Sequence, residues 1–203
     1  MKKGKKGNAI DSLPRVFVIG FNRCGTRTIH WYFKANGHRA IHWDDGNLAD
    51  TIFRNLGASL PLLTGYESYS VFSDMERVSR EAALEAYKLY AQLDVSYPNS
   101  VFILNTRDVD GWIRSRLAAG EGRYAKKWKH HLKAKSDEEL AFLWRQDWET
   151  HHRNAERYFS GRPSRFLKFN IETDRPEKIN QLVPEYGLDP EKYAPRGRGG
   201  PTS

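Results

Sequence analysis

The chain has 203 residues, of which 39% are hydrophobic and six are tryptophans, and its formal net charge is +8. This size and composition suit one domain with a sizeable core and exclude a largely disordered chain. The apolar runs are far shorter than a membrane span, and no apolar segment typical of a signal peptide precedes the first strand. The single cysteine excludes an internal disulfide, and we therefore expect a cytoplasmic protein.

The basic balance predicts an anionic partner. Nucleic acid, anionic lipid, an acidic glycan and a multiply charged nucleotide would each satisfy it, and charge alone does not choose among them. We expect residues 1–14 to be a basic flexible tail, residues 15–185 to be the folded domain, and residues 186–203 to be a C-terminal tail.

Strands and helices alternate along the chain. The apolar pattern predicts strands at residues 16–19, 39–43, 70–73, 101–105 and 165–170. It predicts helices at residues 26–36, 47–56, 81–93 and 176–183, one after Asp108, and a long one opened by the capping box at 136–139. This order predicts a three-layer α/β/α domain with a central parallel sheet, in which ligands bind beyond the carboxyl ends of the strands.

The loop between the first strand and the first helix carries two glycines, two arginines and two threonines. Backbone N–H groups at a helix N-terminus, together with guanidinium groups beside them, predict a phosphate or sulfate site. The loop lacks the Gly-Lys-Ser/Thr ending of an ATP-type phosphate loop, so no hydroxyl stands where a nucleotide-bound magnesium would be held. The expected anion-binding residues are Arg23, Cys24, Gly25, Thr26, Arg27 and Thr28.

A second candidate anion site follows the strand at 101–105. Arg107 lies at the strand tip and Ser115 lies two helical turns later, so both face the neighbouring loop and could share one phosphate. The alternative is an arginine paired with Asp108 or Asp110 and a serine that faces solvent. Two anion sites at neighbouring strand ends suit a nucleotide with phosphates at both ends of its ribose, such as 3′-phosphoadenosine 5′-phosphosulfate.

These motifs resemble those of the sulfotransferases, most closely the short bacterial type. Members have a basic-small-Gly-Thr/Ser loop, like the one that begins at Arg23, and a strand-ending Arg followed eight positions later by Ser, like Arg107 and Ser115. A His after the next strand corresponds to His42, and the likeness covers roughly residues 15–185. It implies a P-loop-like sulfotransferase fold, a sulfotransferase domain over 15–185, and 3′-phosphoadenosine 5′-phosphosulfate as co-substrate.

The chain departs from the family pattern at three places. Arg27 stands where a small or hydroxyl residue is usual, and Arg23 stands where many members have Lys. The tail that contains Arg196 and Arg198 faintly resembles the loop that closes over the 3′-phosphate in animal cytosolic enzymes, so these two arginines are further candidate nucleotide contacts.

The resemblance implies transfer of a sulfonate to a hydroxyl or amine of a small-molecule or glycan acceptor, without a metal. Arg23 would stabilise developing charge, and the acceptor would need a base. Asp74 is the first choice, because it follows a strand and should face the site. His42 and Glu76 are the alternatives, although a packed histidine and a solvated helix-starting glutamate are at least as common.

Three other interpretations stay open at this point. Cys24 could be a phosphatase nucleophile, but that chemistry needs an arginine at position 30, which is a histidine. A nucleotide kinase would require the missing Lys-Ser/Thr. The basic segment 120–135 could be a lid, an acceptor-binding segment or a solvated helix. The chain carries no recognised nucleic-acid-binding signature, so we expect no nucleic-acid partner. The oligomeric state and the acceptor are left open.

Overall fold

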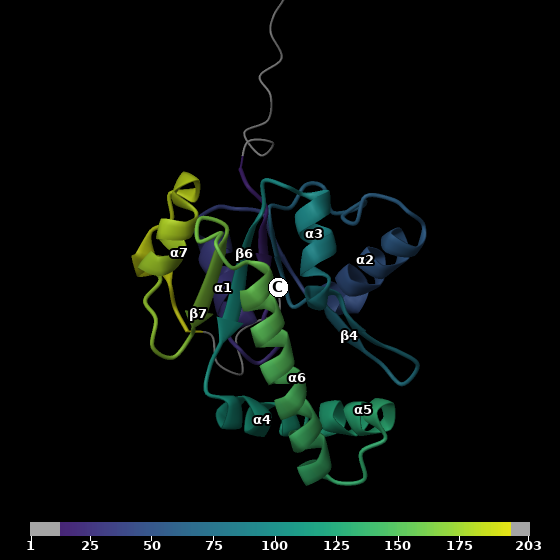
Figure 1. Ribbon diagram of the computed structural model, residues 1–203. Helices are drawn as coiled ribbons and strands as arrows, with labels where there is room; N and C mark the ends of the chain where they lie inside the picture. The colour runs from purple at the N-terminus through teal and green to yellow at the C-terminus, as the bar shows by residue number, and fades with distance from the viewer. Residues whose placement is uncertain (1–12, 196–203) are drawn as a thin grey trace, which may run out of the picture.

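A five-stranded parallel sheet forms the centre of the computed structural model, which describes residues 13–195 (Figure 1). The strand order is β2-β3-β1-β6-β7, and each neighbouring pair is parallel. The strands are β1 (Val16–Val18), β2 (Ala40–His42), β3 (Val71–Ser73), β6 (Val101–Thr106) and β7 (Phe166–Asn170).

Both faces of the sheet are buried, as parallel sheets require. Along β1, Val16 and Val18 face one apolar cluster, and Phe17 faces the other. One face is covered by α1 (Thr26–Ala35) and α7 (Glu177–Leu182). The opposite face is covered by α2 (Asn47–Gly57), α3 (Tyr90–Ser96) and α6 (Asp137–Tyr158). The three-layer α/β/α architecture with a parallel sheet is therefore confirmed.

Smaller elements lie around this core. Helices α4 (Val109–Leu117) and α5 (Arg123–Leu132) lie beyond the end to which the β6 arrow points, where α6 also reaches (Figure 1). Strands β4 (Glu76–Val78) and β5 (Ala83–Glu85) form an antiparallel hairpin. Short 3-10 turns occupy Asp44–Gly46, Ala86–Lys88, Pro184–Tyr186 and Pro190–Lys192.

The helix expected at residues 81–93 was wrong. The chain is extended at Ala83–Glu85, where it pairs with β4, and the α-helix begins only at Tyr90. The Ser79 hydroxyl accepts the backbone N–H groups of Glu81 and Ala82 and so closes the turn between the two strands. A helical apolar pattern is a weak guide where a local turn lets the strands pair instead.

The packed part of the chain continues past residue 185. Tyr186 is 3% exposed and its ring contacts Phe33 of α1, while Tyr193 packs edge-on against Tyr32. Helix α1 is therefore held from its outer side by the C-terminal segment. Residues 1–12 and 196–203 lie outside the described part, and the expectations for Arg196 and Arg198 fall there.

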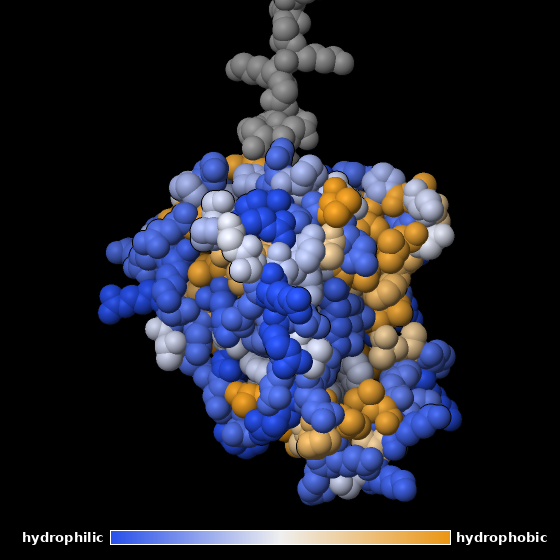
Figure 2. All heavy atoms as spheres, in the orientation of Figure 1, coloured by the Kyte–Doolittle hydropathy of each residue, from blue (hydrophilic) through white to orange (hydrophobic). Residues whose placement is uncertain are grey.

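The face of the molecule in Figure 2 is largely hydrophilic, with hydrophobic side chains gathered over α2 and α3. Leu56 and Val95 belong to this patch and are 39% and 79% exposed. Within residues 13–195, no helix combines the length and the apolar character that crossing a membrane would take.

Candidate active site

The loop at residues 20–25 is held by side chains that bind its carbonyl groups. Asn105, at the buried end of β6, donates to the carbonyl of Cys24 at 2.9 Å. The Trp112 indole donates to the carbonyl of Asn22 at 3.0 Å. With these two carbonyls turned toward the protein, we expect the N–H groups of residues 21–25 to face the opposite side, as in an anion-binding concavity. Sequence reasoning missed Asn105, although a polar residue in an apolar strand is a usable signal.

Two glycines make this loop possible. A Cβ at Gly20 would lie 2.0 Å from the carbonyl oxygen of Asn105, so the strand and loop could not approach this closely with any other residue. Gly25 has a φ of +76°, and a Cβ there would lie 2.7 Å from Ile171. Helix α1 begins at the next residue without a side-chain cap, so the first-turn N–H groups face the loop without a capping side chain.

The two predicted anion motifs meet at the carboxyl ends of β1 and β6. Arg23 Nε donates to the hydroxyl of Ser115 at 3.1 Å. A terminal nitrogen of Arg107 contacts the carbonyl of Arg23 at 3.4 Å. The connections that leave β1 and β6 run to opposite sides of the sheet, so this is the topological switch point at which ligands bind in such folds.

Arg107 does not pair with either of the aspartates named as alternatives. Its Nη2 donates to Glu172 at 2.6 Å, and the other Glu172 oxygen accepts the N–H of Asp108 at 2.9 Å. Asp108 instead caps α4 through the N–H of Gly111. The Arg107 Nε is buried and has no hydrogen-bond partner among residues 13–195. Glu172, which follows β7, carries no sequence signal that would have marked it.

His42 and Asp74 lie next to each other at the ends of β2 and β3. His42 Nε2 is 3.4 Å from Asp74 Oδ2, and His42 Nδ1 is 3.0 Å from the Ser73 hydroxyl. Burial lowers the pKa of His42 to about 4, with Arg27 acting in the same direction. Burial raises the pKa of Asp74 to about 6, against the opposing effect of nearby arginines. At neutral pH the pair is thus a neutral imidazole beside an ionised carboxylate.

Backbone strain gathers at this edge of the sheet. A positive φ is uncommon in residues other than glycine. Each such residue costs of order 1–3 kcal/mol. Asp74 has a φ of 54°, and Arg23 has a φ of 64°. Three consecutive residues after β2, 43–45, share this conformation. Such strain is typical of positions where function fixes the direction of a side chain.

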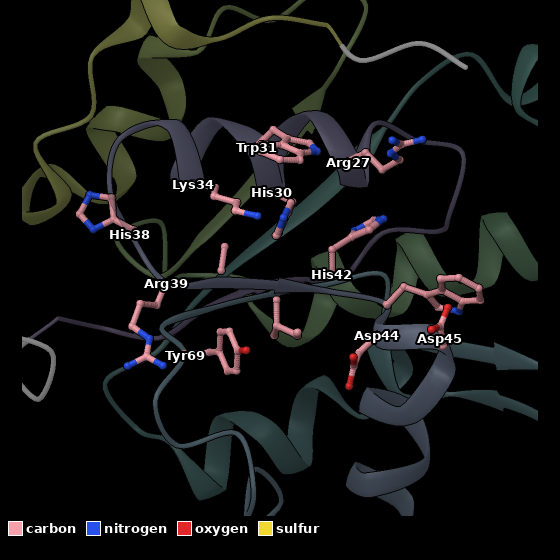
Figure 3. Close-up of a pocket in the computed structure, with 13 residues that line it drawn as sticks. Arg27, His30, Trp31, Lys34, His38, Arg39, His42, Asp44, Asp45 and Tyr69 are labelled. Atoms are coloured by element: carbon pink, nitrogen blue, oxygen red, sulfur yellow. The ribbon is translucent and has the colours of Figure 1, made fainter. Parts of the chain in front are cut away.

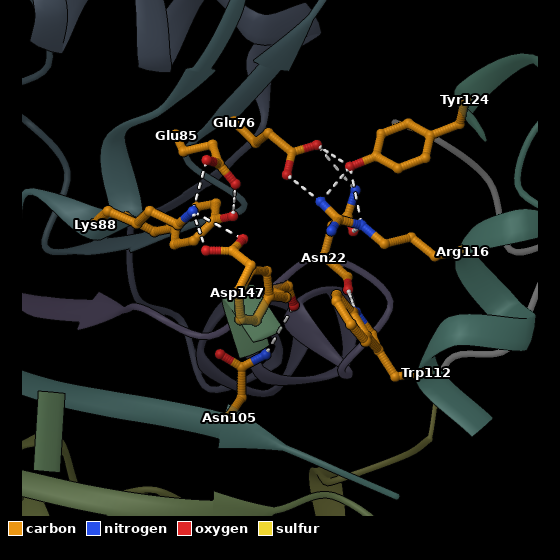
Figure 4. A network of polar contacts seen from close by, with 11 residues as sticks. Asn22, Glu76, Glu85, Lys88, Asn105, Trp112, Arg116, Tyr124 and Asp147 are labelled. Atoms are coloured by element: carbon orange, nitrogen blue, oxygen red, sulfur yellow. Dashed lines mark hydrogen bonds and ion pairs between the residues drawn. The ribbon is translucent and has the colours of Figure 1, made fainter. Parts of the chain in front are cut away.

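Glu76 is part of a buried network and is not a solvated helix-starting residue (Figure 4). Its carboxylate accepts from Arg116 at 3.1 Å, from the Tyr124 hydroxyl at 2.5 Å and from the side-chain amide of Asn22 at 3.0 Å. Burial raises the pKa of Glu76 to about 7, although Arg116 opposes the shift. With its oxygens engaged, Glu76 is better placed to hold the loop through Asn22 than to accept a proton from a substrate.

Arg116 is fully buried at the centre of this network. Besides Glu76, its guanidinium donates to the side-chain oxygen of Asn22 at 3.1 Å and to the Tyr124 hydroxyl. It lies about 5 Å from five aromatic rings, those of Phe21, Trp112, Tyr124, Trp128 and Trp144. The sequence did not single it out, because Arg114 on the same helix looks equivalent and is exposed.

The segment expected to be a lid or a solvated helix is α5 with its flanks. Tyr124 and Trp128 bind it to the core, and His131 contacts the carbonyl of Ser79 at 2.8 Å. The lysines between these contacts, such as Lys126, are exposed. The inner face of this helix therefore belongs to the fold, while its outer face carries the charge.

The remaining candidates lie along the start of α1. Cys24 is fully buried, and burial raises the pKa of its thiol well above the usual range, so the phosphatase alternative lacks a thiolate nucleophile. Thr26 and Thr28 are buried in the first helical turn, and Arg27 lines a cavity that reaches His42.

Among residues 13–195, no cluster of three His, Cys, Asp or Glu side chains could hold a metal ion.

The comparisons with known proteins identify the family. A family model described as a sulfotransferase domain matches residues 15–165, which is most of the chain. A search among curated proteins found no match. The matched range contains both anion motifs, the His42–Asp74 pair and the buried Glu76 network. The chain belongs to the sulfotransferase family, and its activity is the transfer of a sulfonate group.

Proposed function

We propose that the sulfonate donor is 3′-phosphoadenosine 5′-phosphosulfate and that the acceptor is a hydroxyl or amine of a small molecule or glycan. The observation that carries the proposal is the contact between Arg23 and Ser115. The contact brings two predicted anion motifs, 92 residues apart in sequence, next to each other. A single doubly phosphorylated nucleotide can then bridge both.

The two ends of the donor would bind different groups. The 5′-phosphosulfate would lie against Arg23, the loop N–H groups and the start of α1. The 3′-phosphate would lie against Arg107 and Ser115. The unpartnered buried Nε of Arg107 supports this assignment, because a phosphate beside the guanidinium would supply the missing acceptor.

In the proposed reaction with a hydroxyl acceptor, the acceptor oxygen attacks the sulfur in line with the leaving phosphate. The bond between sulfur and the bridging oxygen breaks, the bond between sulfur and the acceptor oxygen forms, and 3′-phosphoadenosine 5′-phosphate leaves. Asp74 takes the proton of the acceptor, with neutral His42 beside it. Arg23 and the loop N–H groups stabilise the charge that builds on the leaving phosphate and the sulfonate oxygens.

Calorimetric titration without added metal tests the proposal. We expect 3′-phosphoadenosine 5′-phosphate to bind much more tightly than ADP, and Arg107→Ala to remove this preference. Arg157→Ala is the matched control, because Arg157 is an exposed residue in the last turn of α6. Equal affinity for the two nucleotides, or no binding of either, would contradict the proposal. A steep salt dependence of binding to a random oligonucleotide would favour the nucleic-acid alternative.

A further inference from the structure

A cavity of about 750 Å³ lies between α1 and the edge strand β2 (Figure 3). Arg27 and His42 line one end, so the cavity begins at the candidate active site. In Figure 3, His30 and Lys34 extend from α1 toward β2, and His42 extends from the strand side toward the helix. The donor contacts proposed above use none of the residues beyond Arg27.

The cavity is an elongated groove, and its two walls agree in length. On α1, Arg27 and Lys34 are seven residues apart, which is about 10 Å at the rise of an α-helix. On the strand side, Arg39 and His42 are three residues apart, which is about 10 Å at the rise of a strand. Because α1 runs back across the sheet between two parallel strands, Lys34 and Arg39 mark the same end of the groove, and in Figure 3 their side chains lie on opposite sides of β2.

The far end of the groove is cationic. Lys34 and Arg39 are both exposed, and their charged groups lie over aromatic rings: Lys34 Nζ is 4.5 Å from the ring centre of Trp31, and the Arg39 guanidinium is 5.7 Å from that of Tyr69. The acidic residues of the groove, including Asp44, follow His42 at the opposite end. Arg27 also lies at that end, but Asp44 and Asp45 outnumber it, so an anionic group would be oriented with its charge toward Lys34 and Arg39.

The middle and near end suit hydroxyl groups on a ring. His30 is 8% exposed, and its Nδ1 is buried with no hydrogen-bond partner among residues 13–195. Its ring centre lies 5.4 Å from that of His42. Burial lowers the pKa of His30 to about 3, so it is a neutral donor and acceptor at physiological pH. Trp43 is 46% exposed and offers a flat apolar face.

We propose that this groove binds the acceptor, and that the acceptor is an acidic saccharide longer than one sugar ring. Its carboxylate or sulfate lies over the edge of β2 between Lys34 and Arg39, its hydroxyls bond to His30 and Asp44, and its reacting hydroxyl lies beside Asp74. The inference rests on the proposed function, since it assigns the second substrate of the same site. The combination of cations, aromatic faces and hydroxyl-binding side chains favours a sugar over an apolar acid.

The test uses full-length protein saturated with 3′-phosphoadenosine 5′-phosphate. Two probes are titrated by calorimetry: a disaccharide with a terminal glucuronic acid, and its methyl ester, which lacks the charge and adds no hydroxyl. We expect the acid to bind about tenfold more tightly than the ester, as charge-assisted hydrogen bonds allow. The variant Lys34→Gln/Arg39→Gln should lose this preference while it retains its affinity for the nucleotide.

The control variant Lys126→Gln/Arg157→Gln removes the same charge from exposed residues of α5 and α6 and should keep the preference. Equal binding of acid and ester to the wild type, or an unchanged preference in Lys34→Gln/Arg39→Gln, would overturn the groove assignment while nucleotide binding stands. Failure of the nucleotide to bind the wild type would overturn the proposed function and, with it, this inference.

Discussion

Arg107 and Glu172 form an ion pair at 2.6 Å at the point where the 3′-phosphate is proposed to bind. The Arg107 side chain is 26% exposed and that of Glu172 is 37% exposed, so solvent reaches the pair. A phosphate that binds Arg107 must share it with this carboxylate or displace it. We therefore expect the pair to hold the guanidinium in place before the nucleotide binds and to lower its affinity for the 3′-phosphate.

Removal of this competing charge should strengthen nucleotide binding. We expect Glu172→Gln to bind 3′-phosphoadenosine 5′-phosphate roughly two- to fivefold more tightly, since partly exposed ion pairs contribute up to about 1 kcal/mol. Affinity for ADP, which lacks the 3′-phosphate, should change less. Calorimetry on both nucleotides measures the difference, with Glu121→Gln as the control because Glu121 is 90% exposed and pairs with Arg123 in the turn before α5. Weaker binding by Glu172→Gln would show that Glu172 supports the site.

Asp74 should be required for transfer and dispensable for nucleotide binding. We expect Asp74→Asn to lower the rate of sulfonate transfer by about 10²-fold or more, the usual contribution of a general base. Its affinity for 3′-phosphoadenosine 5′-phosphate should match that of the wild type. Steady-state kinetics with the disaccharide probe and calorimetry together separate the two effects. A rate close to that of the wild type would assign the proton transfer to another residue.

The pH dependence should identify Asp74 by its raised pKa. A base must be ionised to accept a proton, and burial raises the pKa of Asp74 to about 6. The transfer rate should therefore fall as the pH drops through about 6 and level off above about 7. His42 would produce a fall near pH 4 instead, because its pKa is lowered to about 4. A rate profile that is flat between pH 5 and 8 would exclude Asp74 as the base.

The ion pair between Glu76 and Arg116 should dominate the stability of the loop region. Glu76→Gln leaves a buried guanidinium without its carboxylate, and such a loss typically costs about 3–5 kcal/mol. We expect Arg116→Met/Glu76→Met to be less destabilised than Glu76→Gln, since it removes both charges. Urea unfolding of the three proteins measures this order. A Glu76→Gln protein as stable as the wild type would contradict the buried network.

Alkylation of Cys24 should report on nucleotide binding through stability. Because the thiol is fully buried, iodoacetamide should react with the folded protein only when it opens. Nucleotide at 100 times its dissociation constant stabilises the native state by about 2.7 kcal/mol, which slows a reaction that needs global opening about hundredfold. Mass spectrometry at timed intervals follows the modification. Rapid alkylation without nucleotide would contradict the burial of this residue.

Much of the fold could be predicted because its signals are local. The apolar strand before Gly20 and the capping box at Ser136 depend on sequence spacing alone. The region at 81–93 could not be predicted in this way. Its residues are compatible with a helix, and pairing with Glu76–Val78 decides that 83–85 are extended.

The candidate site likewise has a part that the sequence predicts and a part that it does not. The glycine-rich loop, Arg107 and Ser115 are recognisable in sequence, because each has a fixed offset from a strand end. The partners of these residues are not. Asn105 and Arg116 act through contacts with the loop that only the folded sheet creates, and Glu172 meets Arg107 because β7 lies beside β6. The buried role of Glu76 depends on α4 and α5 together.

One thermodynamic cycle tests the bridging of the two anion sites most directly. The affinities of wild type and Arg107→Ala are measured for 3′-phosphoadenosine 5′-phosphate and for adenosine 5′-phosphate, which differ only in the 3′-phosphate. We predict that the wild type strongly prefers the doubly phosphorylated nucleotide and that Arg107→Ala binds both with similar affinity. An equal preference in the two proteins would show that the guanidinium at 107 does not contact the 3′-phosphate and would contradict the assignment of this site.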